Sequence, residues 1–256
     1  VYFLSAYQEL FLVIFSLLAL INFKSKPFRS LLFFVLALLS KETAIILPVL
    51  VILLNYRYIK NNFYHLRSTI YTTTILSVIY LYFRLFHFGL ATGDSYLWNF
   101  SPIKTANTLL WYILWSFGAP ELLVDYVGSG LQLVPRFFTD YQYWWPFIIF
   151  PLLGLLTSTG ILALKKLPSF KFVLFFIISL LPLLFLPSHK FTLELGLPLV
   201  GFSIALASII PNKFNILSFC FFVFLIFTNL SMNYLTYTRH YSVSRGEISQ
   251  KVFNYF

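Results

Sequence analysis

The chain has 256 residues, of which 59% are hydrophobic and only 10% are charged, and its mean hydropathy is +0.84. This composition excludes an ordinary soluble domain and predicts an all-α, polytopic transmembrane helix bundle. The net charge of +10 does not indicate nucleic-acid binding, because Lys and Arg are scattered through short connections between apolar spans, where they indicate membrane topology.

The first predicted span covers residues 2–23 and follows directly on Val1. It is too long for a cleavable signal peptide and has no small-residue cleavage site, so we expect a membrane span in a chain that is truncated at its N-terminus. Tyr7, Gln8 and Glu9 begin this span. An ordinary helix start in the headgroup zone is the simpler interpretation, and a polar site is the alternative.

The second predicted span, 31–54, is apolar except for Ser40-Lys41-Glu42-Thr43 near its middle. A Lys at mid-span costs roughly 2.5 to 3.5 kcal/mol, so this pair is expected to have a function or a route to water. The length of 24 residues fits a single crossing. A hairpin or broken helix would instead give two limbs of about 21 Å, too short to traverse the membrane fully.

The basic connections decide between these alternatives in favour of a hairpin or broken helix. The segments 24–29, 57–67, 165–171 and 211–213 contain ten Lys or Arg and no acid, which is typical of cytoplasmic loops. All four can be cytoplasmic only if 31–54 enters and leaves on the same side and 103–117 does not cross. The eight acids then fall on or near the outer face: Glu9, Glu42, Asp94, Glu121, Asp125, Asp140, Glu194 and Glu247.

A span at 68–90 leads into the largest region without a span, 88–143. Gly, Pro and Asp mark this region as an outer-face loop, with 103–117 as an embedded or interfacial helix. Each acid in it is a candidate base or sugar-hydroxyl acceptor, although solvated loop acids are common. The aromatic residues of 141–145 fit an interfacial belt better than a sugar-stacking platform.

Further spans are predicted at 144–164, 170–187, 193–210 and 214–232, followed by a polar outer tail, 234–256, that begins a further C-terminal domain. Ser188-His189-Lys190 lies at the outer junction of two spans. It is either a second cation cluster suited to a phosphate or an interfacial anchor. No phosphate-cradling Gly loop, HExxH, CxxC or GxSxG motif occurs, so neither a cofactor nor a divalent metal is indicated.

The run Leu39-Ser40-Lys41-Glu42 resembles a Leu-Ser-Lys-Glu run of the GT-C membrane glycosyltransferases. The similar members are the protein O-mannosyltransferase-like group and its relatives with tetratricopeptide repeats. Their preceding span opens on a serine-glycine-arginine-x-acid pattern, of which only Ser5 and Glu9 match here.

Other stretches are similar to the same family more loosely. Pro120, Leu123, Asp125 and Tyr126 match a proline-x-x-leucine-x-x-aspartate-tyrosine element. The His189-Lys190 pair falls where relatives have a charged dipeptide, although 191–193 replaces their usual tyrosines. Arg239-His240 resembles the arginine-asparagine of the family's last outer segment.

The resemblance implies an enzyme that moves a sugar, with inversion, from a polyprenyl-phosphate donor to a protein or glycan acceptor at the outer face. Lys41, His189 and Lys190 would hold the donor phosphate, whose developing charge they would stabilise in the transition state. Supporting roles would fall to Glu9, Glu42, Asp125, Tyr126 and Arg239. The family's catalytic acid lies upstream of Val1, so no base is assigned within the chain.

The alternative function is a transporter or flippase of a lipid-linked saccharide, in which the same cations bind and nothing reacts. In either case the expected partners are the lipid-linked sugar and membrane lipids, with no nucleic acid. The expected location is the plasma (inner) membrane of a prokaryote, crossed several times.

Overall fold

A computed structural model of the chain describes residues 4–87, 89, 96–127, 133–213, 215–239, 246, 248, 250–253 and 255. The described residues are mostly helical and contain no β-strand, which confirms the predicted all-α class. Within them, five helical segments are long and apolar enough to cross a membrane: Glu42–Tyr64, Leu66–Phe86, Trp145–Lys165, Thr192–Ile209 and Ile216–Thr238. By helix length and composition, the protein is therefore an integral membrane protein.

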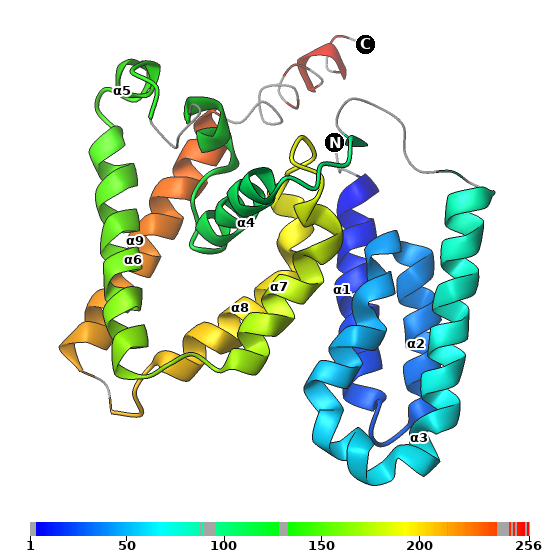
Figure 1. The fold of residues 1–256 in the computed structure, drawn as a ribbon. Coiled ribbons are helices and arrows are strands. Elements are labelled where there is room, and N and C mark those ends of the chain that lie inside the picture. The colour runs from blue at the N-terminus through cyan, green and yellow to red at the C-terminus, as the bar shows by residue number, and fades with distance from the viewer. Residues whose placement is uncertain are drawn as a thin grey trace. The chain divides into compact units, whose positions relative to one another are not determined.

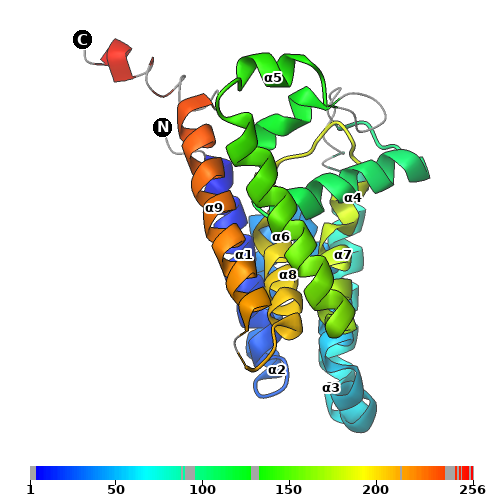
Figure 2. The same ribbon diagram turned by 90° about the vertical axis from the view of Figure 1, so that its left-hand side faces the viewer.

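The chain divides into two compact units (Figures 1 and 2). The first unit comprises Tyr2–Leu109 and Ser169–Ala205, and the second comprises Leu110–Pro168 and Leu206–Phe256. Helices α1 (Leu4–Asn22), α2 (Pro27–Ser40), α3 (Leu47–Phe86) and α7 (Phe170–Leu184) belong to the first unit. Helices α5 (Arg136–Asp140), α6 (Trp145–Lys165) and α9 (Ile216–Arg239) belong to the second.

The predicted span 31–54 is broken at Lys41. Helix α2 ends at Ser40, Lys41 has extended backbone angles (φ −159°, ψ 143°), and the short 3-10 helix η1 (Glu42–Ile46) leads into α3. Pro48 lies in the first turn of α3, where its missing N–H costs no helical hydrogen bond. The 14 residues of α2 rise about 21 Å, less than the hydrocarbon thickness of about 30 Å.

Helix α3 continues through 57–67, where the sequence predicts a connecting loop. It bends at Asn55 and Asn62, whose backbone angles are not helical. Each Asn side chain donates to the carbonyl four residues earlier, at 3.1 Å in both cases. Because 55–67 contains no Gly or Pro, the helix bends there without ending, and its second limb returns toward the end where α3 begins (Figure 1).

The basic connections of the first unit meet at one end, which we call the basic end and define by Lys24, Tyr58 and Lys171. The Tyr58 hydroxyl donates to the Lys24 carbonyl at 3.3 Å, and the Lys24 ammonium lies 5.5 Å from the centre of the Tyr58 ring. Lys171 Nζ donates to the Leu54 carbonyl. Since α1 and α2 each run between this end and the region of Glu9 and Lys41, the described acids of the first unit lie at its other end.

The core of the first unit is formed by α1, α2, η1, α3, α7 and α8 (Gly196–Ile209). Phe34, Leu47 and Leu50 are almost fully buried in it. Gly201 lets α8 approach α7 closely, because a Cβ atom there would lie 2.6 Å from Phe175 Cδ1 and 2.9 Å from the backbone N of Phe176. The contact between α7 and α8 therefore requires glycine.

In the second unit, α6 and α9 pack side by side (Figures 1 and 2). The Trp144 and Tyr234 rings lie 4.6 Å apart, which joins the start of α6 to the last third of α9. Helix α9 extends to Arg239, beyond the predicted end of its span at 232, because no Gly or Pro interrupts it. The region 88–143, predicted as a loop, contains α4 (Pro102–Ser116), which nearly matches the predicted helix 103–117, and the 3-10 helix η3 (Glu121–Tyr126).

We expect the substitution Gly201→Ala to destabilise the first unit by about 1 to 3 kcal/mol, because the new methyl group forces α7 and α8 apart. Gly160→Ala in α6 is the matched control, since a Cβ there has nothing within 4 Å and alanine favours a helix. Thermal unfolding of both variants in detergent checks the difference. Equal melting temperatures would contradict the close approach at Gly201.

Candidate functional site

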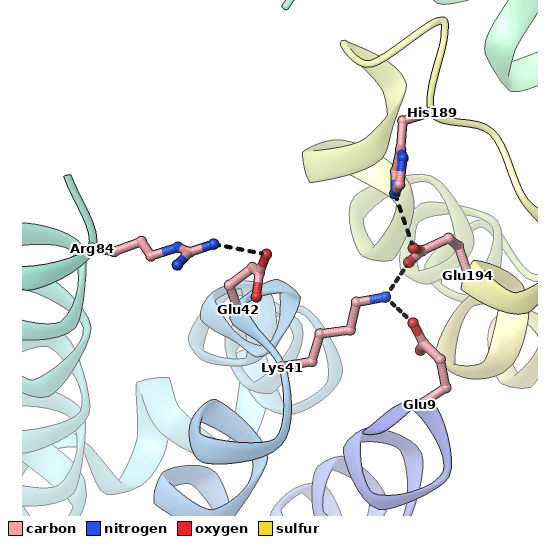
Figure 3. Close-up of polar contacts among 6 residues, drawn as sticks. All are labelled: Glu9, Lys41, Glu42, Arg84, His189 and Glu194. Carbon is pink, nitrogen blue, oxygen red and sulfur yellow. Dashed lines mark hydrogen bonds and ion pairs between the residues drawn. The ribbon is translucent and has the colours of Figure 1, made fainter. Parts of the chain in front are cut away.

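The side chain of Lys41 lies between two carboxylates from distant parts of the chain. Its Nζ donates to Glu9 Oε1 in α1 and, at 2.5 Å, to Glu194 Oε2 in the 3-10 helix η4 (Thr192–Leu195) that precedes α8 (Figure 3). The three side chains are 16%, 6% and 8% exposed, respectively. We call Glu9, Lys41, Glu194 and the neighbouring His189 the charge cluster.

The charge cluster ties three elements together. Lys41 occupies the tip between α2 and η1, Glu9 lies in the second turn of α1, and Glu194 precedes α8. A buried ammonium and its carboxylates are stable only while paired, and removing one partner typically costs about 3 to 5 kcal/mol. Glu9 Oε2 is also buried and has no hydrogen-bond partner among the described residues.

His189 belongs to the loop between α7 and η4 and contacts Glu194 of the charge cluster. Its Nε2 lies 3.8 Å from Glu194 Oε1, and its ring packs 4.2 Å from the Tyr96 ring and 4.9 Å from the Phe191 ring. Burial lowers the pKa of His189, and the nearby Glu194 carboxylate opposes this shift. The imidazole is therefore mostly neutral at pH 7 and can donate and accept one hydrogen bond each.

Glu42 points away from Lys41, as expected for adjacent residues, and pairs with Arg84 at the end of α3 (Figure 3). Arg84 Nη2 lies 3.3 Å from Glu42 Oε1, and the Glu42 side chain is 54% exposed. An ion pair this exposed contributes roughly 0 to 1 kcal/mol. It marks the return of α3 to this end of the unit.

Lys190 follows His189 and is half-buried, without a carboxylate partner among the described residues. Its Nζ lies 3.5 Å from the neutral amide oxygen Oδ1 of Asn107 in α4. Burial lowers the pKa of Lys190 because the charged form loses hydration. Lys190 thus lies at the same end as the charge cluster. No described acid contacts its ammonium.

Asp125 and Tyr126 belong to the second unit, whereas the charge cluster belongs to the first. The Tyr126 hydroxyl donates to Asp140 Oδ2 at 2.9 Å, and Arg136 Nε donates to the same oxygen at 3.1 Å. Burial, together with the hydrogen bond to Asp140, raises the pKa of Tyr126. Asp140 therefore connects Tyr126 of η3 to Arg136 of α5. Asp125 is exposed.

Several predicted residues lie outside the described part of the chain. These are Asp94, His240 and Glu247, together with the side chains of Ser5 and Arg239. Of the predicted site, the structure brings together Glu9, Lys41 and His189, with Glu42 and Lys190 next to them in sequence.

The sequence interpretation did not single out Glu194, Arg84 or Asn107 as site residues. Glu194 was placed only among the outer acids, although a lone acid inside the apolar run 191–200 is itself a signal of a buried partner. Nothing in the sequence pattern identifies Asn107, because its contact depends on how α4 lies against the loop at Lys190.

Among the described residues, no group of three or more His, Cys, Asp or Glu could hold a metal ion. Comparisons with known protein families, curated proteins and solved structures find no match to this chain.

We expect Lys41→Met to destabilise the first unit by about 3 to 5 kcal/mol, because it leaves Glu9 and Glu194 buried without a countercharge. The control is Glu42→Gln, which removes an adjacent but exposed charge and should change stability by less than about 1 kcal/mol.

The triple variant Glu9→Gln, Lys41→Met, Glu194→Gln should recover part of the stability lost in Lys41→Met, since no unpaired buried charge remains. Thermal unfolding in detergent measures all three variants. If Lys41→Met unfolds no earlier than Glu42→Gln, the charge cluster does not hold the elements together.

Proposed function

We propose that this chain is the donor-binding part of a membrane glycosyltransferase that uses a polyprenyl-phosphate sugar. The sugar passes with inversion to a protein or glycan acceptor at the outer face of a prokaryotic plasma membrane. The observation that carries the proposal is the half-buried ammonium of Lys190, which contacts no acid among the described residues and follows His189 of the charge cluster in sequence.

At this end of the first unit, the half-buried ammonium of Lys190 has no acid in contact with it among the described residues. Glu9 and Glu194 are both engaged by Lys41, and Glu42 is engaged by Arg84. Lys190 has only a neutral amide within reach among the described residues. A half-buried cation without a countercharge favours an anion there, and a lipid phosphate reaches the end of a membrane span from the bilayer itself.

The geometry supports separate roles for the predicted phosphate-binding residues. Lys190 binds the donor phosphate, and the neutral imidazole of His189 offers a hydrogen bond next to it. Lys41 is already held by two carboxylates, so we assign it to positioning the tip between α2 and η1. As the sugar leaves, charge develops on the phosphate, and a fixed ammonium there lowers the barrier.

No catalytic base is assigned among the described residues. Glu9 and Glu194 are committed to Lys41, Asp140 is committed to Tyr126 and Arg136, and Glu42 is committed to Arg84. Donor binding is therefore the part of the proposed reaction that this chain can be tested for by itself.

We expect Lys190→Gln to weaken binding of a polyprenyl phosphate by at least roughly tenfold, because a charge-assisted contact to phosphate contributes about 1.5 to 3 kcal/mol. The control is Lys104→Gln, which removes an exposed cation from α4, the helix that carries Asn107. Binding is measured by titrating the purified chain in nanodiscs with a fluorescent polyprenyl phosphate.

Equal binding by the Lys190→Gln and Lys104→Gln variants would contradict the proposed phosphate site. An assay for transfer of labelled sugar to an acceptor then separates the enzyme from the alternative. A chain that binds the donor and moves it across the bilayer without transfer to any acceptor would be a flippase, which is the competing function.

A further inference from the structure

The basic end of the first unit carries a feature that the proposed function does not use. Lys171, at the start of α7, donates from Nζ to the Leu54 carbonyl, just before α3 bends at Asn55. Asn55, next to this carbonyl, has non-helical backbone angles (φ −120°, ψ 16°), and a cation is favourable near helix carbonyls at such an irregular point. An ammonium has three donors, so Lys171 retains two for another acceptor.

An apolar groove opens directly beside this contact. It has a volume of about 200 Å³ and is lined by apolar residues of α1, α3, α7 and α8, all within the first unit. Leu54 belongs both to the lining and to the contact with Lys171, and Phe172 is the next residue in α7. The remaining walls include Leu20, Ile21, Val200 and Ile204.

The size and chemistry of the groove fit part of a hydrocarbon chain. An apolar cavity of roughly 150 Å³ already accepts a molecule the size of benzene and does not fill with water. Ile21 and Ile204 are 72% and 40% exposed, so the groove is open to whatever surrounds the bundle. For a helix bundle in a bilayer, that surrounding is lipid.

The charges next to the groove are all positive. The segments of the first unit that reach this end, 24–29, 57–67 and 169–171, contain seven Lys or Arg and no acid. Lys24 and Lys171 are both exposed. Basic side chains between transmembrane helices are typical binding sites for anionic lipid headgroups.

We propose that the basic end and its groove form a binding site for one anionic membrane phospholipid. The headgroup phosphate contacts Lys171, with Lys24 contributing from the adjacent connection, and an acyl chain lies in the groove. This site is at the opposite end of the first unit from Lys190 and does not depend on the proposed glycosyltransferase activity.

The test compares lipid retention by the purified chain. Native mass spectrometry of the chain titrated with phosphatidylglycerol and phosphatidylcholine should show one phosphatidylglycerol bound in preference to phosphatidylcholine. Lys171→Gln should reduce that preference roughly fivefold, as expected for one cation at a membrane surface, and Lys171→Arg should retain it. The control Lys166→Gln removes an exposed cation from the same connection and should change the preference less than about twofold.

A second pair of variants tests the groove itself. Ile204→Trp fills the groove and should lower retention of both lipids, while Leu164→Trp places the same side chain at a position that is 88% exposed and should not. Equal retention of the two lipids would overturn the proposal. Equal effects of Lys171→Gln and Lys166→Gln would also overturn it, because the positive charge of the connection would then explain lipid binding without a specific site. Unchanged retention by Ile204→Trp would exclude the groove.

Discussion

The contact between the Lys41 ammonium and the carboxylates of Glu9 and Glu194 is the constraint on which the first unit depends. It joins the tip between α2 and η1 to α1 and to the entry of α8, and it does so where the chain is otherwise apolar. Hydrophobic packing alone distinguishes poorly among alternative registers of such helices in lipid, because the bilayer is as apolar as the side chains. A buried charge with two partners in fixed positions allows one arrangement.

The charged residues of the first unit gather at two ends. Acids and cations meet at the end that holds Lys41, Glu42 and His189, whereas Lys24 and Lys171 mark an end whose connections carry only cations. This distribution fits a bundle whose basic end faces the cytoplasm. It also explains why the two proposed anion sites differ: one is a single half-buried Lys190 in a polar surrounding, and the other is an exposed Lys171 beside an apolar groove.

Much of this arrangement could be predicted from the sequence, because it follows from local pattern. The mid-span charges at Lys41 and Glu42 predict a break, and the basic connections predict that the chain turns back there. The continuity of α3 through 57–67 could not be predicted, since basic and polar residues resemble a loop although Asn55 and Asn62 bend the helix without ending it. Composition does not distinguish a helical bend from a loop.

The contact partners of the predicted site residues could not be predicted from the sequence. Glu194 is 153 residues from Lys41, and no local pattern pairs them. The resemblance implies that Lys41 binds a phosphate anion, but the structure supplies two anions for it from the chain itself. The same reasoning now applies to Lys190, whose described contact is neutral.

The most direct test of this account is the membrane face on which each end of the first unit lies. In a background that lacks the single cysteine (Cys220→Ala), cysteines are placed singly at the exposed positions Lys26 and Glu42. A membrane-impermeant maleimide added to intact cells should label position 42, and it should label position 26 only after the membrane is opened. Labelling of both positions from the same face would contradict the separation of charges between the two ends.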